Sequence, residues 1–363
     1  MAFNRIPRLG PARFRLMEKY FGSMLKAWDA PSSEFKAAGL DEETVKSIQA
    51  KRPTLDPDGE LERMEKAGVR AMNWNDSSYP SRLKEIYDPP PVLYVLGTLL
   101  PEDERSVAVV GTRKATAYGK EVTYRISSDL ARNQVTVVSG LARGIDAMAH
   151  RAALEAGGRT LAVMGSGPDI IYPSEHTALA QQIAQTGALL SEHPIGVKPS
   201  PGNFPRRNRI MSGMTLGTLV VEAGDTSGAL WTVRHALEQD REVFAVPGSI
   251  FSQVSRGCNQ LIQEGAKLVL DYNDILEELN LSAVGQQTEM KALFPKDETE
   301  SKVLRYVTYE PVHIDDVIRS SGLPIATVSS TLALMEVKGM VKQVGSMNYV
   351  RLKETVAEYE TPA

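Results

Sequence analysis

The chain contains few of the residues that build disulfide frameworks or metal sites. Its 363 residues include one cysteine, Cys258, which excludes an internal disulfide network and a cysteine zinc site. The five histidines show no metal-ligand spacing, so we expect no metal and no cofactor. No apolar run is long enough to span a membrane, and the first residues lack the apolar centre of a signal peptide. We therefore expect a cytoplasmic protein with no membrane partner.

A strongly basic balance is also absent. The formal net charge is -4 and the sequence pI is about 5.9, so any binding of nucleic acid must come from a local basic cluster. With 42% hydrophobic residues, a chain of this length can bury a sizeable core and form two or three domains.

An apolar run ends in a glycine, a hydroxyl and a guanidinium at residues 107–113, Val-Ala-Val-Val-Gly-Thr-Arg. Such a run is typical of a parallel strand that is covered on both faces, and ligands bind beyond the carboxyl ends of these strands. Gly111 would let a phosphate approach the backbone, and a helix expected over residues 118–132 would point its N-terminal amides the same way. We expect an anionic ligand beside Thr112 and Arg113.

Apolar runs and amphipathic stretches alternate between residues 106 and 279. The apolar runs are residues 107–110, 135–138, 160–164, 188–190, 219–221 and 243–246. Strands that alternate with helices of this length predict right-handed βαβ units. The fold class is therefore α/β, with a doubly wound, mostly parallel sheet. A short strand at residues 70–74 and an apolar strand after Asp88 are expected to extend this sheet.

The N-terminal residues predict a small helical domain. A turn at Gly10-Pro11 leads into an amphipathic helix closed by Gly22, and a second helix follows from residue 41 to about 51. Two interpretations remain open: an ordinary helical cap, or a helix-hairpin-helix type (SAM-like) module that brings its turn, with Arg8 and Arg13, to a DNA phosphate. A proline-bracketed linker at residues 52–57 gives an N-terminal domain over residues 1–55 and a core over residues 56–285.

The C-terminal residues 286–363 predict a linker, which includes Gln286-Gln287-Thr288, and a winged-helix-like domain. Helices are expected over residues 299–308, 314–320 and 325–338, followed by a hairpin over residues 341–352. The third helix carries a buried stripe of Val328, Leu332 and Met335. Residues 325–337 contain no lysine or arginine, which favours protein contact or dimer support over the reading of bases.

Each expected core strand ends in glycine or in small polar residues. Because the carboxyl ends of parallel strands meet at one sheet edge, these loops form a concave surface of backbone amides that suits phosphates. A second feature is Phe-Pro-Arg-Arg-Asn-Arg over residues 204–209, with three arginines in four positions at a helix start. Arg206 and Arg209 share a helix face, and we expect Arg207 or Arg209 to pair with a core acid such as Glu222 or Asp146.

A catalytic role finds weaker support. Asp146 and His150 lie one helical turn apart, yet Asp146 is well placed to accept the first amides of a helix and His150 to be a hydrogen-bonded interior group. Glu222, at the end of a buried strand, is the other candidate carboxylate. The first turn lacks G-x-G-x-x-G, and the second strand ends in Ser139-Gly140 instead of an acid, which argues against a nicotinamide or flavin enzyme.

At these residues the sequence resembles the DNA-processing protein A (DprA/Smf) family. The likeness runs from residue 75 to residue 279 through Gly-Thr-Arg, Ser-Gly-Leu-Ala-Arg-Gly-Ile-Asp-Ala-Met-Ala-His, Tyr172-Pro173, Ser-Glu-His-Pro, Val-Glu-Ala-Gly-Asp-Thr-Ser-Gly and Ala-Val-Pro-Gly. The resemblance implies an extended Rossmann-like core that binds single-stranded DNA without sequence preference and forms a homodimer. It further implies a protein without a catalytic step that protects incoming strands and loads a RecA-type recombinase during natural transformation.

The resemblance assigns strand binding to the Gly-Thr-Arg turn, to Phe204, and to the basic residues Lys198 and Arg206. Combined with the glycine loops and the arginine cluster, it gives a set of expected strand contacts. These are Gly111, Thr112, Arg113, Gly140, Arg143, Gly144, Gly165, Lys198, Phe204, Arg206, Arg207, Asn208, Arg209, Ser227 and Gly228.

The fold also resembles nucleotide-cleaving proteins of the lysine-decarboxylase-like group. Those enzymes carry Pro-Gly-Gly-x-Gly-Thr and a glutamate where this chain has Val-Glu-Ala-Gly-Asp-Thr-Ser-Gly from residue 221. The glutamate comes first here, which favours the binding protein. A nucleotide-binding or nucleotide-cleaving enzyme stays as the alternative.

Overall fold

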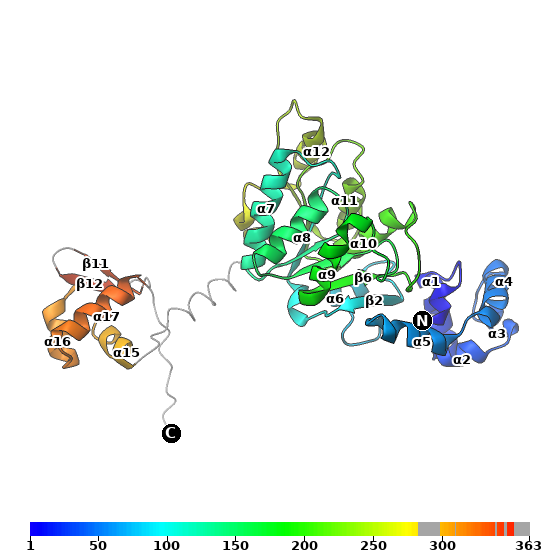
Figure 1. Ribbon diagram of the computed structural model, residues 1–363, viewed down its shortest axis with the longest axis horizontal. Coiled ribbons are helices and arrows are strands. Elements are labelled where there is room, and N and C mark those ends of the chain that lie inside the picture. Colours follow the sequence, from blue (N-terminus) through cyan, green and yellow to red (C-terminus); the bar gives the residue numbers. More distant parts are fainter. Residues whose placement is uncertain (282–297, 309, 338–339, 345–346, 352–363) are drawn as a thin grey trace, which may run out of the picture. The chain divides into compact units, whose positions relative to one another are not determined.

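Figure 1 presents the computed structural model of the chain, which describes residues 1–281, 298–308, 310–337, 340–344 and 347–351. The chain forms two compact units, Met1–Leu279 and Asn280–Ala363. Each unit is described by itself. Within the described residues, no helix is both long and apolar enough to cross a membrane.

The first unit is built on a nine-stranded sheet with the order β1-β2-β6-β5-β4-β3-β7-β8-β9. Its strands are β1 (Val69–Asn73), β2 (Val92–Gly97), β3 (Ser106–Val110), β4 (Thr136–Ser139), β5 (Thr160–Val163), β6 (Ala188–Ser191), β7 (Gly217–Val220), β8 (Glu242–Ala245) and β9 (Lys267–Leu268). All neighbours from β6 to β9 are parallel, whereas β1 and β2 add antiparallel pairs at the other edge. The mostly parallel sheet and the six expected apolar strands are confirmed.

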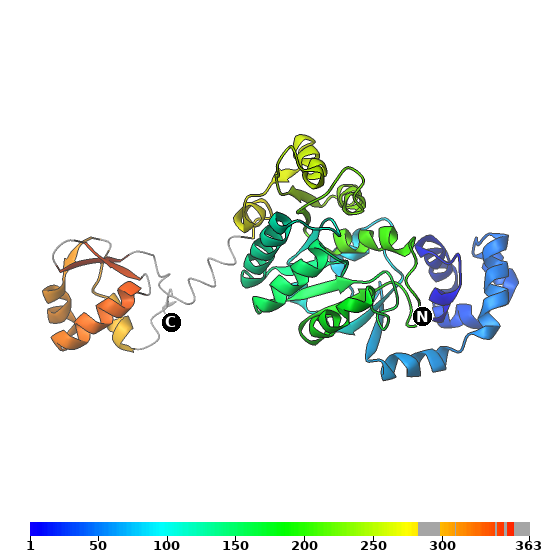
Figure 2. The same cartoon turned by 45° about the horizontal axis from the view of Figure 1, so that its top comes forward.

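Helices lie on both faces of this sheet (Figure 2). They are α6 (Ser81–Glu85), α7 (Ala117–Arg132), α8 (Ile145–Glu155), α9 (Thr177–Thr186), α10 (Asn203–Met214), α11 (Ala229–Glu238), α12 (Arg256–Gln263) and α13 (Tyr272–Glu278). The helix expected after the Gly-Thr-Arg turn is α7, which begins where the Thr116 side chain accepts the Gly119 amide. Strand β3 is buried at every position, because helices cover both faces of the sheet there.

The order in which strands are added to the sheet reverses at β3. From β3 the sheet grows to one side through β4, β5 and β6, and the chain then returns to place β7, β8 and β9 on the other side. The carboxyl ends of β3 and β7 therefore form a topological switch point, where the loops that follow the two strands diverge and leave a crevice.

The N-terminal helices are α1 (Pro11–Phe21), α2 (Met24–Asp29), α3 (Ser32–Ala37), α4 (Glu42–Lys51) and α5 (Pro57–Lys66). The expected first helix is confirmed, with Pro11 in its first turn and Gly22 at φ 68° as its C-cap, and so is the second, capped by Asp41. The short helices α2 and α3 were not expected. Aromatic residues of this region, such as Phe3 and Phe35, share a buried cluster with side chains of the sheet. The three-domain division stays a prediction, because these helices belong to the first compact unit.

Arg8 and Arg13, the two arginines on which the phosphate-binding interpretation of the N-terminal turn depends, both have acidic partners. Arg8 lies 2.6 Å from a carboxylate oxygen of Glu43, and Arg13 lies 2.9 Å from Asp41. All four side chains are at least one-third exposed, so these ion pairs contribute little to stability. Neither interpretation of this region is tested by the pairing.

The second unit contains α15 (Glu298–Leu304), α16 (Ile314–Ser321), α17 (Ile325–Val337) and a sheet of β10 (Val312–His313), β12 (Asn348–Arg351) and β11 (Val341–Gln343). Val328, Leu332 and Met335 are fully buried, which confirms the expected stripe. The first helix ends four residues earlier than expected, and β10 adds a strand to the expected hairpin. The linker prediction at Gln286-Gln287-Thr288 lies outside the described residues.

Candidate nucleic-acid interface

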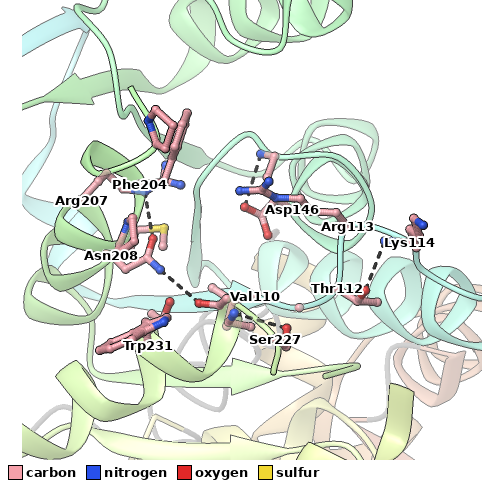
Figure 3. Close-up of a pocket in the computed structure, with 18 of the residues that line it drawn as sticks. Val110, Thr112, Arg113, Lys114, Asp146, Phe204, Arg207, Asn208, Ser227 and Trp231 are labelled. Atoms are coloured by element: carbon pink, nitrogen blue, oxygen red, sulfur yellow. Dashed lines mark hydrogen bonds between the residues drawn. The ribbon is translucent and has the colours of Figure 1, made fainter. Parts of the chain in front are cut away.

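A cavity of about 600 Å³ opens at the switch point, between the loops after β3 and β7 and the helices α8, α10 and α11 (Figure 3). Several of the expected contact residues line it: Gly111, Thr112, Arg113, Phe204, Arg207, Asn208, Ser227 and Gly228. These residues come from three segments of the chain, residues 111–113, 204–208 and 227–228. The structure therefore brings together the Gly-Thr-Arg turn, the arginine-rich helix and the loop after β7.

Two aromatic rings and a guanidinium form one wall of this cavity. The rings of Tyr172 and Phe204 have their centres 5.4 Å apart, tilted by 41°. The guanidinium carbon of Arg113 lies 5.9 Å from the centre of the Phe204 ring, a cation-π distance. Tyr172 is 45% exposed and Arg113 is exposed, so an aromatic surface with an adjacent positive charge faces solvent. Such a surface can stack an unpaired base and hold its phosphate.

The floor of the cavity contains a buried acid and a buried base, Asp146 and Arg207. Burial raises the pKa of Asp146, although its carboxylate accepts the amides of Gly140 and Ala142 and lies near Arg207. Burial lowers the pKa of Arg207 to about 10. Its guanidinium donates to the carbonyl oxygens of Gly140 (2.9 Å) and Val163. Arg207 thus joins α10 to the ends of β4 and β5.

The other two arginines of the cluster share one acid. Arg209 is 3% exposed, and its guanidinium donates to both carboxylate oxygens of Glu192 (3.1 and 2.9 Å) and to Asp88 (2.8 Å). The expectation of a paired core arginine holds for Arg209, but its partners are Glu192 and Asp88 instead of Glu222 or Asp146. Arg206, from the same helix face, lies 3.3 Å from Glu192 and remains half exposed. Of the three arginines, only Arg206 presents its charge to solvent.

Most of the expected glycines lie against protein atoms. A Cβ atom on Gly111 would lie 2.5 Å from Ile145, and one on Gly165 would lie 2.8 Å from the Phe204 ring. A Cβ on Gly140 would overlap the Arg207 guanidinium, and Gly144 has φ +77° beside the Thr112 carbonyl. The glycines therefore let α10 and α8 approach the sheet closely. The expectation that their amides also contact a strand stays a prediction, and the Thr112 amide already donates to the Glu222 carbonyl (2.7 Å).

Seven of the expected residues do not line the 600 Å³ cavity: Gly140, Arg143, Gly144, Gly165, Lys198, Arg206 and Arg209. Arg143 is exposed and makes a bidentate ion pair with Glu175 (2.8 and 2.7 Å), and this pair raises the pKa of Arg143 above its ordinary value. Lys198 is exposed on the loop between β6 and α10. Ser227 and Gly228 lie at the start of α11, where the Ser227 hydroxyl accepts the Ala229 amide (3.3 Å).

The groups that suggested catalysis have structural partners. His150 is fully buried, and its Nδ1 lies 2.6 Å from the Thr160 hydroxyl, which itself donates to the Val137 carbonyl. Nδ1 therefore carries the proton, and burial lowers the pKa of His150 to about 3. The expectation of a hydrogen-bonded interior histidine is confirmed. Asp146 accepts amides of the loop before α8, so it serves that loop instead of the first amides of the helix.

Glu222 is 1% exposed at the end of β7. Its carboxylate accepts the backbone amide (2.9 Å) and the hydroxyl (2.5 Å) of Thr116, the residue that caps α7. A carboxylate at a helix N-terminus is stabilised by the partial positive charge there. The side chain is thus committed to the start of α7 and does not line the cavity.

Among the cavity residues that the expected contacts omit are one cation and two aromatic residues: Lys114, Tyr172 and Trp231. Tyr172 stands in a motif that carried the family resemblance, and Lys114 directly follows the Gly-Thr-Arg turn, so both were within reach of sequence reasoning. Trp231 follows the Ser-Gly turn by three positions. No cluster of histidine, cysteine, aspartate and glutamate suited to a metal occurs among the residues that the structure describes.

Comparison with known proteins identifies the families that the chain resembles. A model described as DNA recombination-mediator protein A matches residues 70–280, and one described as DprA winged helix domain matches residues 287–346. The chain is 35% identical to Protein Smf of Synechocystis sp. over 97% of this chain and 98% of that protein.

The similar solved structures include two DNA processing proteins. DNA processing protein A of Streptococcus pneumoniae gives a TM-score of 0.68 at 35% identity, over 76% of this chain and 95% of that one. DNA processing protein A of Helicobacter pylori, which is described with a single-stranded DNA binding mode, gives a TM-score of 0.53 at 28% identity, over 58% and 95%.

Proposed function

Because the chain belongs to the DNA recombination-mediator protein A family, we propose that it binds single-stranded DNA without sequence preference in the cavity at the switch point of its sheet. The observation that carries this proposal is the wall formed by Tyr172, Phe204 and Arg113. Every base has a π-face, so stacking on an aromatic ring selects unpaired bases without selecting their sequence.

The charge distribution fits this ligand. The chain as a whole is acidic, but Arg113 and Lys114 are exposed at the cavity and form no ion pair within the described residues. Unpaired guanidinium and ammonium groups next to an aromatic surface suit a phosphodiester that passes beside a stacked base. Paired arginines such as Arg209 and Arg143 would have to give up an acid first.

Arg113→Glu tests the proposal by fluorescence anisotropy with a labelled oligodeoxythymidine. Loss of a charge-assisted contact, worth about 1.5–3 kcal/mol, should weaken binding by about 10- to 150-fold. The dependence of log K on log salt should become shallower by about 0.7, because one phosphate contact is lost. Arg125→Glu is the matched control, since Arg125 is exposed on α7 and does not line the cavity. Equal affinities of the two variants would contradict the proposal.

We further propose that strand binding protects incoming DNA and loads a RecA-type recombinase during natural transformation, with the chain acting as a homodimer of its Rossmann-like core. Family membership supports this part. Light scattering should give twice the 39.7 kDa mass of one chain. Recombinase filaments should assemble faster on strands incubated with the chain than on strands incubated with the same concentration of the Arg113→Glu variant, and equal rates would contradict the loading role.

The nucleotide-cleaving alternative makes a different prediction. Incubation with nucleoside monophosphates would release free bases in a reaction that depends on Glu222. The geometry gives this alternative no support, because the Glu222 carboxylate is occupied by Thr116 at the start of α7. Chromatography of the released bases separates the two functions without any DNA.

A further inference from the structure

We propose that Trp231, together with Arg234, forms a second base-binding position in the cavity, so that one strand is held at two stacking points. This inference rests on the proposed binding of single-stranded DNA. Trp231 lies in the first turn of α11 (Ala229–Glu238) and lines the same cavity as Phe204. The ligand class at this position is an unpaired nucleobase with its neighbouring phosphate.

Trp231 differs from the other two tryptophans of the chain in its surroundings. Trp74 is 6% exposed and its indole N–H donates to Glu18 (2.9 Å), and Trp28 packs edge-on against Phe3 with ring centres 5.0 Å apart. Trp231 is 48% exposed, and no described side chain accepts a hydrogen bond from its indole. About half of this large apolar side chain is therefore exposed, and it lines the cavity, where a stacked base could cover it.

The same pair of groups occurs at two places on the cavity wall, although of the second pair only Trp231 lines the cavity itself. The guanidinium carbon of Arg234 lies 5.5 Å from the centre of the Trp231 ring, as that of Arg113 lies 5.9 Å from the Phe204 ring. Each pair offers an aromatic face for a base and a cation for the adjacent phosphate. Arg234 is exposed, so its charge is available to a strand.

The two rings are separate positions on one path. Phe204 belongs to α10 and Trp231 to α11, and these helices pack together. Figure 3 shows the two rings apart from each other, with Arg207 and Asn208 between them. The Asn208 amide donates to the Gly228 carbonyl (3.4 Å), which fixes the start of α11 against α10. A strand that follows the cavity wall meets the two aromatic rings in turn, whereas a duplex would keep its bases stacked on each other.

Stacking has a signature that phosphate contact lacks. It releases no condensed counterions, so its loss lowers affinity without changing the salt dependence. Trp231→Ala should weaken binding of oligodeoxythymidine by about 5- to 150-fold, the range for one stacked base. The slope of log K against log salt should equal that of the parent chain, in contrast to Arg113→Glu.

The experiment compares two probes on the full chain, a 20-residue oligodeoxythymidine and a strand of 20 abasic deoxyribose phosphates. Trp231→Ala should weaken binding of the first and leave the second unchanged. Intrinsic fluorescence should be quenched by the oligodeoxythymidine in the parent chain and much less in Trp231→Phe, which keeps a ring and most of the affinity. Leu237→Ala is the matched control, because Leu237 is 62% exposed on α11 and does not line the cavity.

Each outcome decides between the claims. Unchanged affinity of Trp231→Ala for oligodeoxythymidine, or an equal loss on both probes, overturns the second base position. If Arg113→Glu still weakens binding in that case, the proposed function stands without this inference. If neither variant binds more weakly than its control, the proposed function itself fails. A circular dichroism melt of every variant shows that a loss is not due to unfolding, and Trp231→Phe keeps the test valid if Trp231→Ala does not fold.

Discussion

Replacing Arg207 by alanine should destabilise the first unit strongly, although Arg207 lies in a cluster of arginines that sequence reasoning assigns to DNA. The guanidinium is buried and joins α10 to the carbonyls of Gly140 and Val163, and it lies near the buried Asp146. Arg207→Ala leaves both carbonyls without this donor and the Asp146 charge without its nearby cation. Each buried polar group left without its partner costs about 1–3 kcal/mol, and the buried charge left without a nearby cation adds to this, so we expect a total of about 3–5 kcal/mol.

The loss corresponds to a fall in Tm of about 6–20 °C, at roughly 2–4 °C per kcal/mol for a unit of this order of size. Arg206→Ala is the control on the neighbouring position. Arg206 is 53% exposed and pairs with Glu192, so its loss should cost less than about 1 kcal/mol. Differential scanning calorimetry of both variants measures the difference. If Arg207→Ala melted within about 2 °C of Arg206→Ala, the structural role given to Arg207 would be wrong.

Three other predictions address the folded state. His150 should make the free energy of unfolding fall as the pH falls from about 6.5 toward 4, because the folded pKa of about 3 lies below the ordinary value and only the unfolded chain binds a proton in that range. In urea titrations, the pH dependence of the free energy of unfolding should be smaller by about one proton in His150→Leu. An unchanged pH dependence would refute the assignment. Gly119→Ala should cost about 1–3 kcal/mol, since its Cβ would overlap the Glu222 carboxylate, whereas Gly202→Ala meets no atom within 4 Å and should be nearly neutral in the same melts. A chain ending at Gln287 should stay folded and keep most of its affinity for single strands, because Met1–Leu279 forms a compact unit and α17 carries no lysine or arginine; a folded but inactive truncation would make the C-terminal module a DNA-binding element.

The sheet was predictable because its signals are local. Runs such as residues 107–110 are apolar without interruption, and only strands covered on both faces need that pattern. The first helix was predictable for the same reason, since Pro11 and Gly22 mark its two ends by their backbone preferences. The short helices α2 and α3 have weaker signals, a single serine N-cap at Ser23 for α2 and no side-chain cap for α3. Packing of residues such as Phe35 stabilises them.

The roles of the three arginines could not be read from their order. Arg206, Arg207 and Arg209 differ in function because their partners come from distant segments: Glu192 on the loop after β6, Asp88 before β2, and the backbone at the ends of β4 and β5. Helical spacing correctly placed Arg206 and Arg209 on one face. It could not tell that Arg209 is enclosed by two acids while Arg206 reaches solvent.

The glycines show the same limit. A glycine at a strand end is compatible with a phosphate approaching the backbone and with a side chain approaching it. At Gly140 and Gly165 the structure has the second case, since the Arg207 guanidinium and the Phe204 ring occupy the space where a Cβ would lie. Only the three-dimensional contact distinguishes the two.

The most direct test of strand binding at the switch point is a crystal structure of the full chain with a short oligodeoxythymidine. We expect one base stacked on the Phe204 and Tyr172 wall, with its phosphate within hydrogen-bond distance of Arg113. A strand bound away from this wall, on the N-terminal helices or on the C-terminal module with the cavity empty, would contradict the account.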